Sequence, residues 1–300
     1  MKRLLILAGI VAVGASLAAY QAPAQAPAPT PIAAQLDVVK LKDNLFVITS
    51  STPGNAATFS GGNVSVFITD AGVTLVDTKL AAWGQALLDK VKSITPKPVT
   101  TIINTHTHGD HTGNDDKFGK VEIIAHENTK ANMAKMPAFA GDKAQFLPSK
   151  TYTTTLTLGK GKDRIELRYF GAAHTSGDSV IVFPGLRIAQ MGDIFAWKDG
   201  PLCDRNNGGS CVAYPKTVAA AAASLKNIDT VIPGHSPMMK VSDVKEYGRF
   251  MADVVAAAQA AKKAGKTVDE AFAAFSVAKY PGYKNERLKA SMQVIYDESK

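Results

Sequence analysis

The chain has 300 residues, a formal net charge of +8 and a hydrophobic content of 46%. This length suits one large domain or two small ones, and the hydrophobic content is sufficient for a full core. Basic residues alternate with acidic ones and form no block interleaved with aromatic residues, so we favour a soluble cationic surface over nucleic-acid binding. No second long apolar run follows the N-terminal one, so we expect no stable membrane span after processing.

The N-terminus has the pattern of a secretory signal peptide. Lys2 and Arg3 precede an uncharged run over residues 4–19, and small Ala-rich sequence follows. A basic start, a short apolar run and an A-x-A site are typical of such a signal. We predict a signal peptide over 1–24, a disordered leader over 25–36, and a secreted, periplasmic protein. A retained N-terminal anchor is the alternative.

Strands dominate the sequence that follows the leader. Alternating patterns predict two strands within 36–50 and two more within 61–79, each pair joined by a turn. Residues 81–94 have the apolar spacing of a helix. A strand over 98–105 then runs directly into a histidine-rich loop, and 121–136 predicts another strand and helix.

The second half of the chain repeats this scheme. We predict four strands within 151–195, a helix over 218–226, and a strand over 229–236 that ends in a loop. The segment 242–300 is mostly helical. Two strand-rich halves that each carry helices predict an α/β (α+β) fold, a four-layer αββα sandwich. We expect one domain over 37–300 with the helical tail packed on it.

Three of the six histidines fall within H-T-H-G-D-H at 106–111. His106 and His108 are two residues apart in an extended segment, so their side chains point the same way. Gly109 permits a bend that turns Asp110 and His111 toward a neighbouring point. Imidazole and carboxylate side chains that converge in this way suit Zn²⁺. One loop could therefore serve two metal ions.

Three later segments supply further candidate ligands. His174 lies in GAAHTSGDS, Asp193 in QMGDIF and His235 in IPGHSP. Each follows a predicted strand and lies near glycine, where backbone can approach closely. His126 lies where a strand passes into a helix, and a structural role is favoured for it.

These motifs, together with TLVDTK at 74–79, resemble the metallo-β-lactamase-fold hydrolase superfamily over roughly residues 37–240. The resemblance implies two zinc ions per chain: the first held by His106, His108 and His174, the second by Asp110, His111 and His235, with Asp193 bridging both. It also implies that Asp77 orients the histidine loop. Asp110 would orient a metal-bound hydroxide that attacks an ester, thioester, lactone or amide carbonyl.

The exact reaction is left open by these motifs. Asp193 occupies the position of a cysteine in one large group of β-lactamases, and Ala196 that of their lysine, so the ligand set looks closer to glyoxalase II-like hydrolases. Export and the lack of a recognisable glutathione-binding set disfavour glyoxalase II itself. β-Lactamase activity is an alternative. So are a persulfide-dioxygenase-like oxidoreductase with one iron and a non-catalytic binding protein.

The loop 197–217 leaves the predicted strand that carries Asp193 and is expected to lie over the metals. Its two cysteines, Cys203 and Cys211, predict a disulfide in an exported protein; a free pair and metal binding are the alternatives. Candidate contacts to a small-molecule substrate in this loop are Trp197, Lys198, Arg205 and Tyr214. The alternative is a cysteine-stapled surface loop. The oligomeric state is not predicted.

Overall fold

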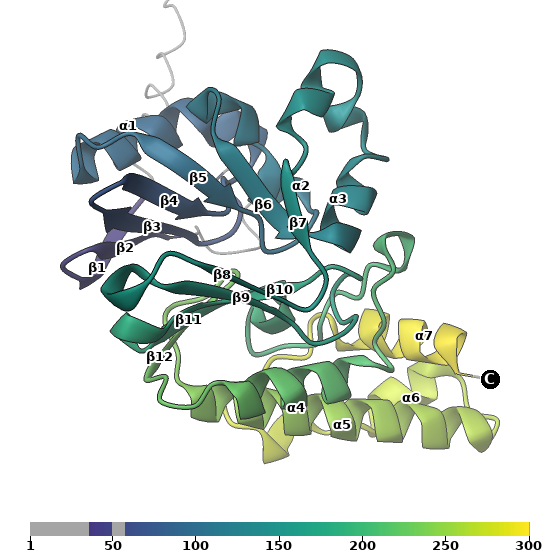
Figure 1. Cartoon of the computed structure of the whole chain (residues 1–300). Coiled ribbons are helices and arrows are strands. Elements are labelled where there is room, and N and C mark those ends of the chain that lie inside the picture. The colour runs from purple at the N-terminus through teal and green to yellow at the C-terminus, as the bar shows by residue number, and fades with distance from the viewer. Residues whose placement is uncertain (1–35, 50–57, 300) are drawn as a thin grey trace, which may run out of the picture. The chain divides into compact units, whose positions relative to one another are not determined.

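Two β-sheets packed face to face lie at the centre of the structure, with helices on both outer faces (Figure 1). The computed structural model describes residues 36–49 and 58–299, all of which belong to one unit that spans Pro31–Lys300. The predicted signal peptide and all but the last residue of the predicted leader lie outside the described residues.

The first sheet combines antiparallel and parallel strands. Its order is β1 (Val38–Lys42), β2 (Leu45–Ile48), β3 (Val64–Thr69), β4 (Gly72–Val76), β5 (Val99–Ile103), β6 (Glu122–His126) and β7 (Lys150–Tyr152). Pairing is antiparallel from β1 to β4 and parallel from β4 to β7. Parallel neighbours need a crossover, which α1 (Gly84–Ile94) and α3 (Glu127–Met133) help to provide.

The second sheet has the order β12 (Thr230–Pro233), β11 (Ile188–Gly192), β10 (Ser179–Phe183), β9 (Ile165–Tyr169) and β8 (Thr155–Leu158). Only β11 and β12 are parallel, and α4 (Tyr214–Ser224) lies between them in the chain. This helix begins four residues before the predicted start. Pro215 occupies its first turn, where a missing backbone N–H costs nothing.

Three apolar layers hold these elements together. Side chains from both sheets meet in the middle, where the rings of Phe67 and Phe183 lie 5.1 Å apart. Leu87 and Val91 of α1, with Trp83 just before it, pack on the outer face of the first sheet. The third layer joins the second sheet to the helices that follow it. The predicted αββα sandwich is confirmed.

The C-terminal tail is helical, as predicted, and consists of α5 (Val241–Lys263), α6 (Val268–Ala274) and α7 (Leu288–Glu298). Its apolar face is part of the third layer, with Tyr247, Phe250 and Ile295 buried. None of the helices in the described part of the chain is long and apolar enough to cross a membrane.

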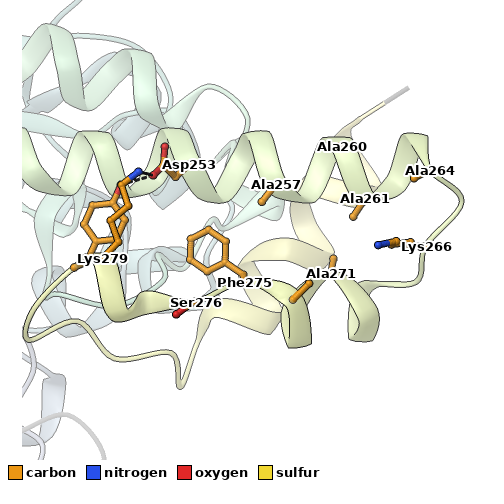
Figure 2. A pocket seen from close by; sticks show the side chains of 12 residues that line it. Asp253, Ala257, Ala260, Ala261, Ala264, Lys266, Ala271, Phe275, Ser276 and Lys279 are labelled. Carbon is orange, nitrogen blue, oxygen red and sulfur yellow. Dashed lines mark hydrogen bonds and ion pairs between the residues drawn. The ribbon is translucent and has the colours of Figure 1, made fainter.

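A groove of about 480 Å³ opens between α5 and α6. Figure 2 shows Ala261, Ala271 and Phe275 along it, with the ion pair of Lys279 and Asp253 at one end. The groove shares no lining residue with the cavity described below, so the tail forms it independently of the histidine cluster.

Candidate metal centre

The predicted ligands come from the ends of several strands. His106 and His108 follow β5, and the short helix α2 (Gly109–Thr112) then carries Asp110 and His111. The other three lie in segments next to strands of the second sheet: Asp193 after β11, His235 after β12 and His174 between β9 and β10. Because β11 and β12 are parallel, their carboxyl ends meet at one edge, which places Asp193 Oδ2 3.3 Å from His235 Nε2.

His106, His108 and His174 form the first group. Their ligand atoms all lie within 4.8 Å of one another, and the Nε2 of His174 is 2.8 Å from the Nδ1 of His108. Burial lowers the pKa of His106 well below its usual value and that of His174 to about 4. Neutral imidazoles present lone pairs, which is the form that binds a metal.

Asp110, His111 and His235 form the second group, again within 4.8 Å. The Nε2 of His235 lies 3.2 Å from the Nε2 of His111 and 3.3 Å from the Oδ2 of Asp110. Burial alone would raise the pKa of Asp110, but the charges of His111 and His235 outweigh it and lower this pKa to about 2. The carboxylate is therefore ionised at neutral pH.

Asp193 lies between the two groups. Its Oδ1 is 3.4 Å from His111 Nε2, and its Oδ2 is 3.6 Å from His174 Nε2. Space around it is tight, because a Cβ on Gly234 would fall 1.9 Å from its Oδ1. Only glycine fits beside this carboxylate.

The buried nitrogen and oxygen atoms of this cluster suit a bound cation. Among the described residues, His106 Nε2 and Asp193 Oδ1 are buried without a hydrogen-bond partner. The Nδ1 of His174 donates to the carbonyl of Leu202 (2.6 Å), so its Nε2 points a lone pair at His108. Unpaired buried polar atoms cost free energy, and a metal ion would satisfy them together. Imidazole nitrogen and carboxylate oxygen are ligands suited to zinc.

Asp77 makes several hydrogen bonds to the histidine loop. Its Oδ2 accepts from His111 Nδ1 and from the Thr105 hydroxyl, each at 2.8 Å, and its Oδ1 accepts from the Thr105 backbone N–H at 2.8 Å. These contacts tie the His111 ring and the Thr105 backbone to one carboxylate. Its backbone has a φ of 68°, a conformation that is costly for a non-glycine residue and that the surrounding contacts maintain.

Asp204 was missed by the sequence analysis. The Nε2 of His108 donates to its Oδ2 at 2.7 Å, and its backbone N–H donates to the His174 carbonyl at 2.8 Å. A disulfide joins Cys203 to Cys211 around this segment, as predicted. The loop that it closes therefore supports two histidines of the first group. The sequence signal that could have indicated Asp204 is its position directly after Cys203, in the loop expected to lie over the metals.

A cavity of about 520 Å³ opens over both groups. Apolar side chains line it together with the ligands, among them Phe59, Trp197, Pro201 and Leu202. Trp197 was predicted to contact substrate, and its ring lies 5.4 Å from that of His235. The cavity is large enough to take a small organic molecule.

The other three candidate substrate contacts lie elsewhere. Lys198 pairs with Asp243 at 2.7 Å and lines a neighbouring cavity. Arg205 is exposed on a 3₁₀ turn and lines neither cavity. Tyr214 is fully buried, and its hydroxyl donates to the Asp193 carbonyl at 2.7 Å, so it lies beneath the cavity instead of on its wall.

His126 lies outside both groups, as the sequence indicated. Its Nδ1 accepts from the Asn128 backbone N–H (3.2 Å) at the start of α3, and its ring stacks on that of Tyr169 at 3.9 Å. These contacts give it a structural role.

A family model described as the metallo-beta-lactamase superfamily matches residues 57–235, which contain all seven predicted ligands. The chain belongs to this superfamily. Metallo-beta-lactamase type 2 of Elizabethkingia meningoseptica is 26% identical over 210 residues, covering 67% of this chain and 79% of the relative. The α subunit of 2,4-dinitroanisole O-demethylase from Nocardioides sp. (strain JS1661) is 35% identical over 100 residues, covering 32% of this chain and 29% of the relative.

Among solved structures, the metallo-beta-lactamase from Pontibacter korlensis has a TM-score of 0.61 and 21% identity. The match covers 99% of that chain but 72% of this one, so this chain has segments beyond the shared fold. The family model ends at residue 235, and the whole helical tail follows it. Superfamily membership supports a metallo-hydrolase with candidate metal-binding histidines and aspartates.

Proposed function

We propose that the protein is an exported hydrolase that uses two zinc ions to cleave an ester, thioester, lactone or amide carbonyl. The observation that carries the proposal is the pair of three-ligand groups with Asp193 between them. His106, His108 and His174 would hold the first ion. Asp110, His111 and His235 would hold the second, and Asp193 would contact both.

Bound zinc supplies an activated water at neutral pH and polarises a carbonyl oxygen. Asp110 and Asp193 both line the cavity, and Asp110 is the more exposed of the two, with 21% of its side chain accessible against 8% for Asp193. Asp110 can therefore orient the attacking water through a hydrogen bond and accept its proton. Asp77 and Asp204 hold His111 and His108 in the tautomers that leave the opposite ring nitrogens free for a metal.

Export has two supports. The N-terminal pattern is that of a signal peptide, and the Cys203–Cys211 disulfide is typical of oxidising compartments. A periplasmic location fits both.

β-Lactam hydrolysis is the second candidate. The observation in its favour is that metallo-beta-lactamase type 2 of Elizabethkingia meningoseptica matches over about four fifths of its length. Asp193 and Ala196 stand at the positions where one group of β-lactamases has cysteine and lysine. We therefore place the β-lactam second among the carbonyl substrates.

The test is a metal count and a substrate screen on the purified protein. We expect two zinc ions per chain and hydrolysis of at least one of three probes: a lactone, a thioester or nitrocefin. Asp110→Asn should abolish that activity. Asp229→Asn, at the opposite end of β12 from His235, should retain it. One iron per chain with oxygen consumption would overturn the proposal in favour of the oxidoreductase alternative.

A further inference from the structure

The helical tail contributes a cation to the cavity over the metal centre. Arg287 immediately precedes α7 and lines this cavity together with Asp110, His174 and His235. Its guanidinium carbon lies 4.2 Å from the centre of the Trp197 ring. Stacking of this kind fixes a guanidinium in place and leaves its N–H groups available at the edge.

Arg287 and the proposed metal ligand His235 both contact the ring of Trp197. The guanidinium carbon of Arg287 lies over the Trp197 ring, and the ring of His235 lies 5.4 Å from that ring at an interplanar angle of 38°. A molecule whose carbonyl lies at the ligand groups could therefore reach the guanidinium with its other end.

The charge of Arg287 has no ion-pair partner within residues 36–49 and 58–299. The two other cations of the neighbouring cavity are neutralised: Lys198 by Asp243 and Glu246, and Lys284 by Glu286 at 3.2 Å. The backbone N–H of Arg287 donates to Asp199 Oδ1 at 3.4 Å, but its guanidinium makes no such bond. A charged group placed in this way is available to a ligand.

The carboxylate of Asp199 does not form an ion pair with the guanidinium of Arg287. Its Oδ1 accepts from the Gly200 backbone N–H at 2.6 Å, and Asp199 as a whole is 4% exposed. It therefore serves the turn that precedes Pro201 and leaves the cavity side of Arg287 open.

Much of the cavity wall near Arg287 and the ligands is apolar. Trp197, Pro201 and Leu202 line it, and Leu202 is 49% exposed although it is a large hydrophobic residue. An apolar surface beside a metal-binding group favours a substrate with a hydrocarbon body. The cavity thus has three parts: the metal ligands, an apolar wall and a cation.

We propose that Arg287 binds a carboxylate of the substrate, so that the enzyme acts on carbonyl compounds with an apolar body and a terminal carboxylate. This inference rests on the proposed hydrolase function. The planar guanidinium matches a carboxylate through two parallel hydrogen bonds. The tail, which lies beyond the family model, thereby sets specificity for the site that the shared fold provides.

The test compares two esters that differ in one group. The p-nitrophenyl ester of pentanoic acid is neutral, and the p-nitrophenyl monoester of pentanedioic acid has the same length and a terminal carboxylate. We expect the zinc-loaded protein to prefer the charged ester. Arg287→Met should lower that preference about 10- to 100-fold, mainly through KM, since hydrogen bonds to charged groups contribute about 1.5–3 kcal/mol. Arg287→Lys should fall between.

Lys289→Met is the matched control. Lys289 is on α7 two residues further along, pairs with Asp269 and lines neither cavity, so the preference should not change. Equal preference in the parent protein and Arg287→Met would overturn the proposal while the hydrolase function stands.

If the parent protein cleaves neither ester, binding of the two free acids measured by calorimetry tests the carboxylate subsite at Arg287 without catalysis. Tighter binding of pentanedioate than of pentanoate, lost in Arg287→Met, supports it. Equal binding of the two acids overturns it.

Discussion

Replacing Asp204 by asparagine is expected to weaken one of the two zinc sites and spare the other. The carboxylate accepts from His108 Nε2 at 2.7 Å and thereby fixes the ring with Nδ1 toward His174. Asparagine keeps the shape and one acceptor oxygen, so the Asp204 side-chain cap on the backbone N–H groups of Asn206 and Asn207 can remain. The amide nitrogen then replaces Oδ2, so the charged acceptor of the His108 Nε2 hydrogen bond is lost.

The expected magnitude follows from that bond. A hydrogen bond to a charged group contributes about 1.5–3 kcal/mol, and the Asp204 side chain is 19% exposed, so we take the lower end. About 1.4 kcal/mol corresponds to a tenfold change in a dissociation constant. This agrees with the roughly 10- to 100-fold losses typical when the partner of a metal-binding histidine is removed.

Competition against a chromophoric chelator, starting from metal-free protein, resolves the two zinc dissociation constants. We expect one constant to rise about tenfold in Asp204→Asn and the other to remain within twofold. Asp229→Asn removes a carboxylate that pairs with Arg187 at the far end of β12 and should leave both constants unchanged. Unchanged constants in Asp204→Asn, or an equal rise in both, would refute this account of the disulfide loop.

Three further changes test other parts of the account. The double substitution Cys203→Ala and Cys211→Ala removes a disulfide between residues that are eight positions apart. It should lower the free energy of unfolding, measured in urea, by about 2.5 kcal/mol and weaken the same zinc site. Unchanged zinc affinity would show that the disulfide is not needed to position the loop. Gly234→Ala should reduce the zinc content below two ions per chain, because its Cβ would fall 1.9 Å from an Asp193 oxygen, and a full zinc content would contradict this crowding. Burial raises the pKa of Asp115 to about 8, so the protonated form is favoured in the folded state and stability is lost as pH rises from about 4 through 8. Urea unfolding at pH 5 and pH 8.5 should therefore show a smaller loss for Asp115→Asn than for the parent protein, and parallel losses would contradict a neutral buried acid.

The clustering of the candidate ligands was predictable because each has a local pattern. Asp193 directly follows β11, and His106 and His235 lie within three residues of the ends of β5 and β12, near glycine. Strand ends that meet at one edge bring such residues together. The four layers were predictable for a similar reason, since apolar alternation and helical spacing are properties of short windows.

What could not be predicted depends on contacts between distant segments. Asp204 and His108 are 96 residues apart, and only the folded path of the disulfide loop brings them to 2.7 Å. Tyr214 was assigned to the cavity from its place in the chain, but the direction of a side chain at a helix start depends on packing, which buries it. Arg287 reaches the cavity from the tail, where the sequence has no motif that links it to the histidines.

A crystal structure of the zinc-loaded protein with anomalous diffraction at the zinc edge tests the central claim most directly. We predict two anomalous peaks per chain. One should lie about 2.0–2.1 Å from nitrogens of His106, His108 and His174, and the other should be bound by Asp110, His111 and His235. A single peak, or a second ion that does not contact His235, would contradict a dinuclear centre.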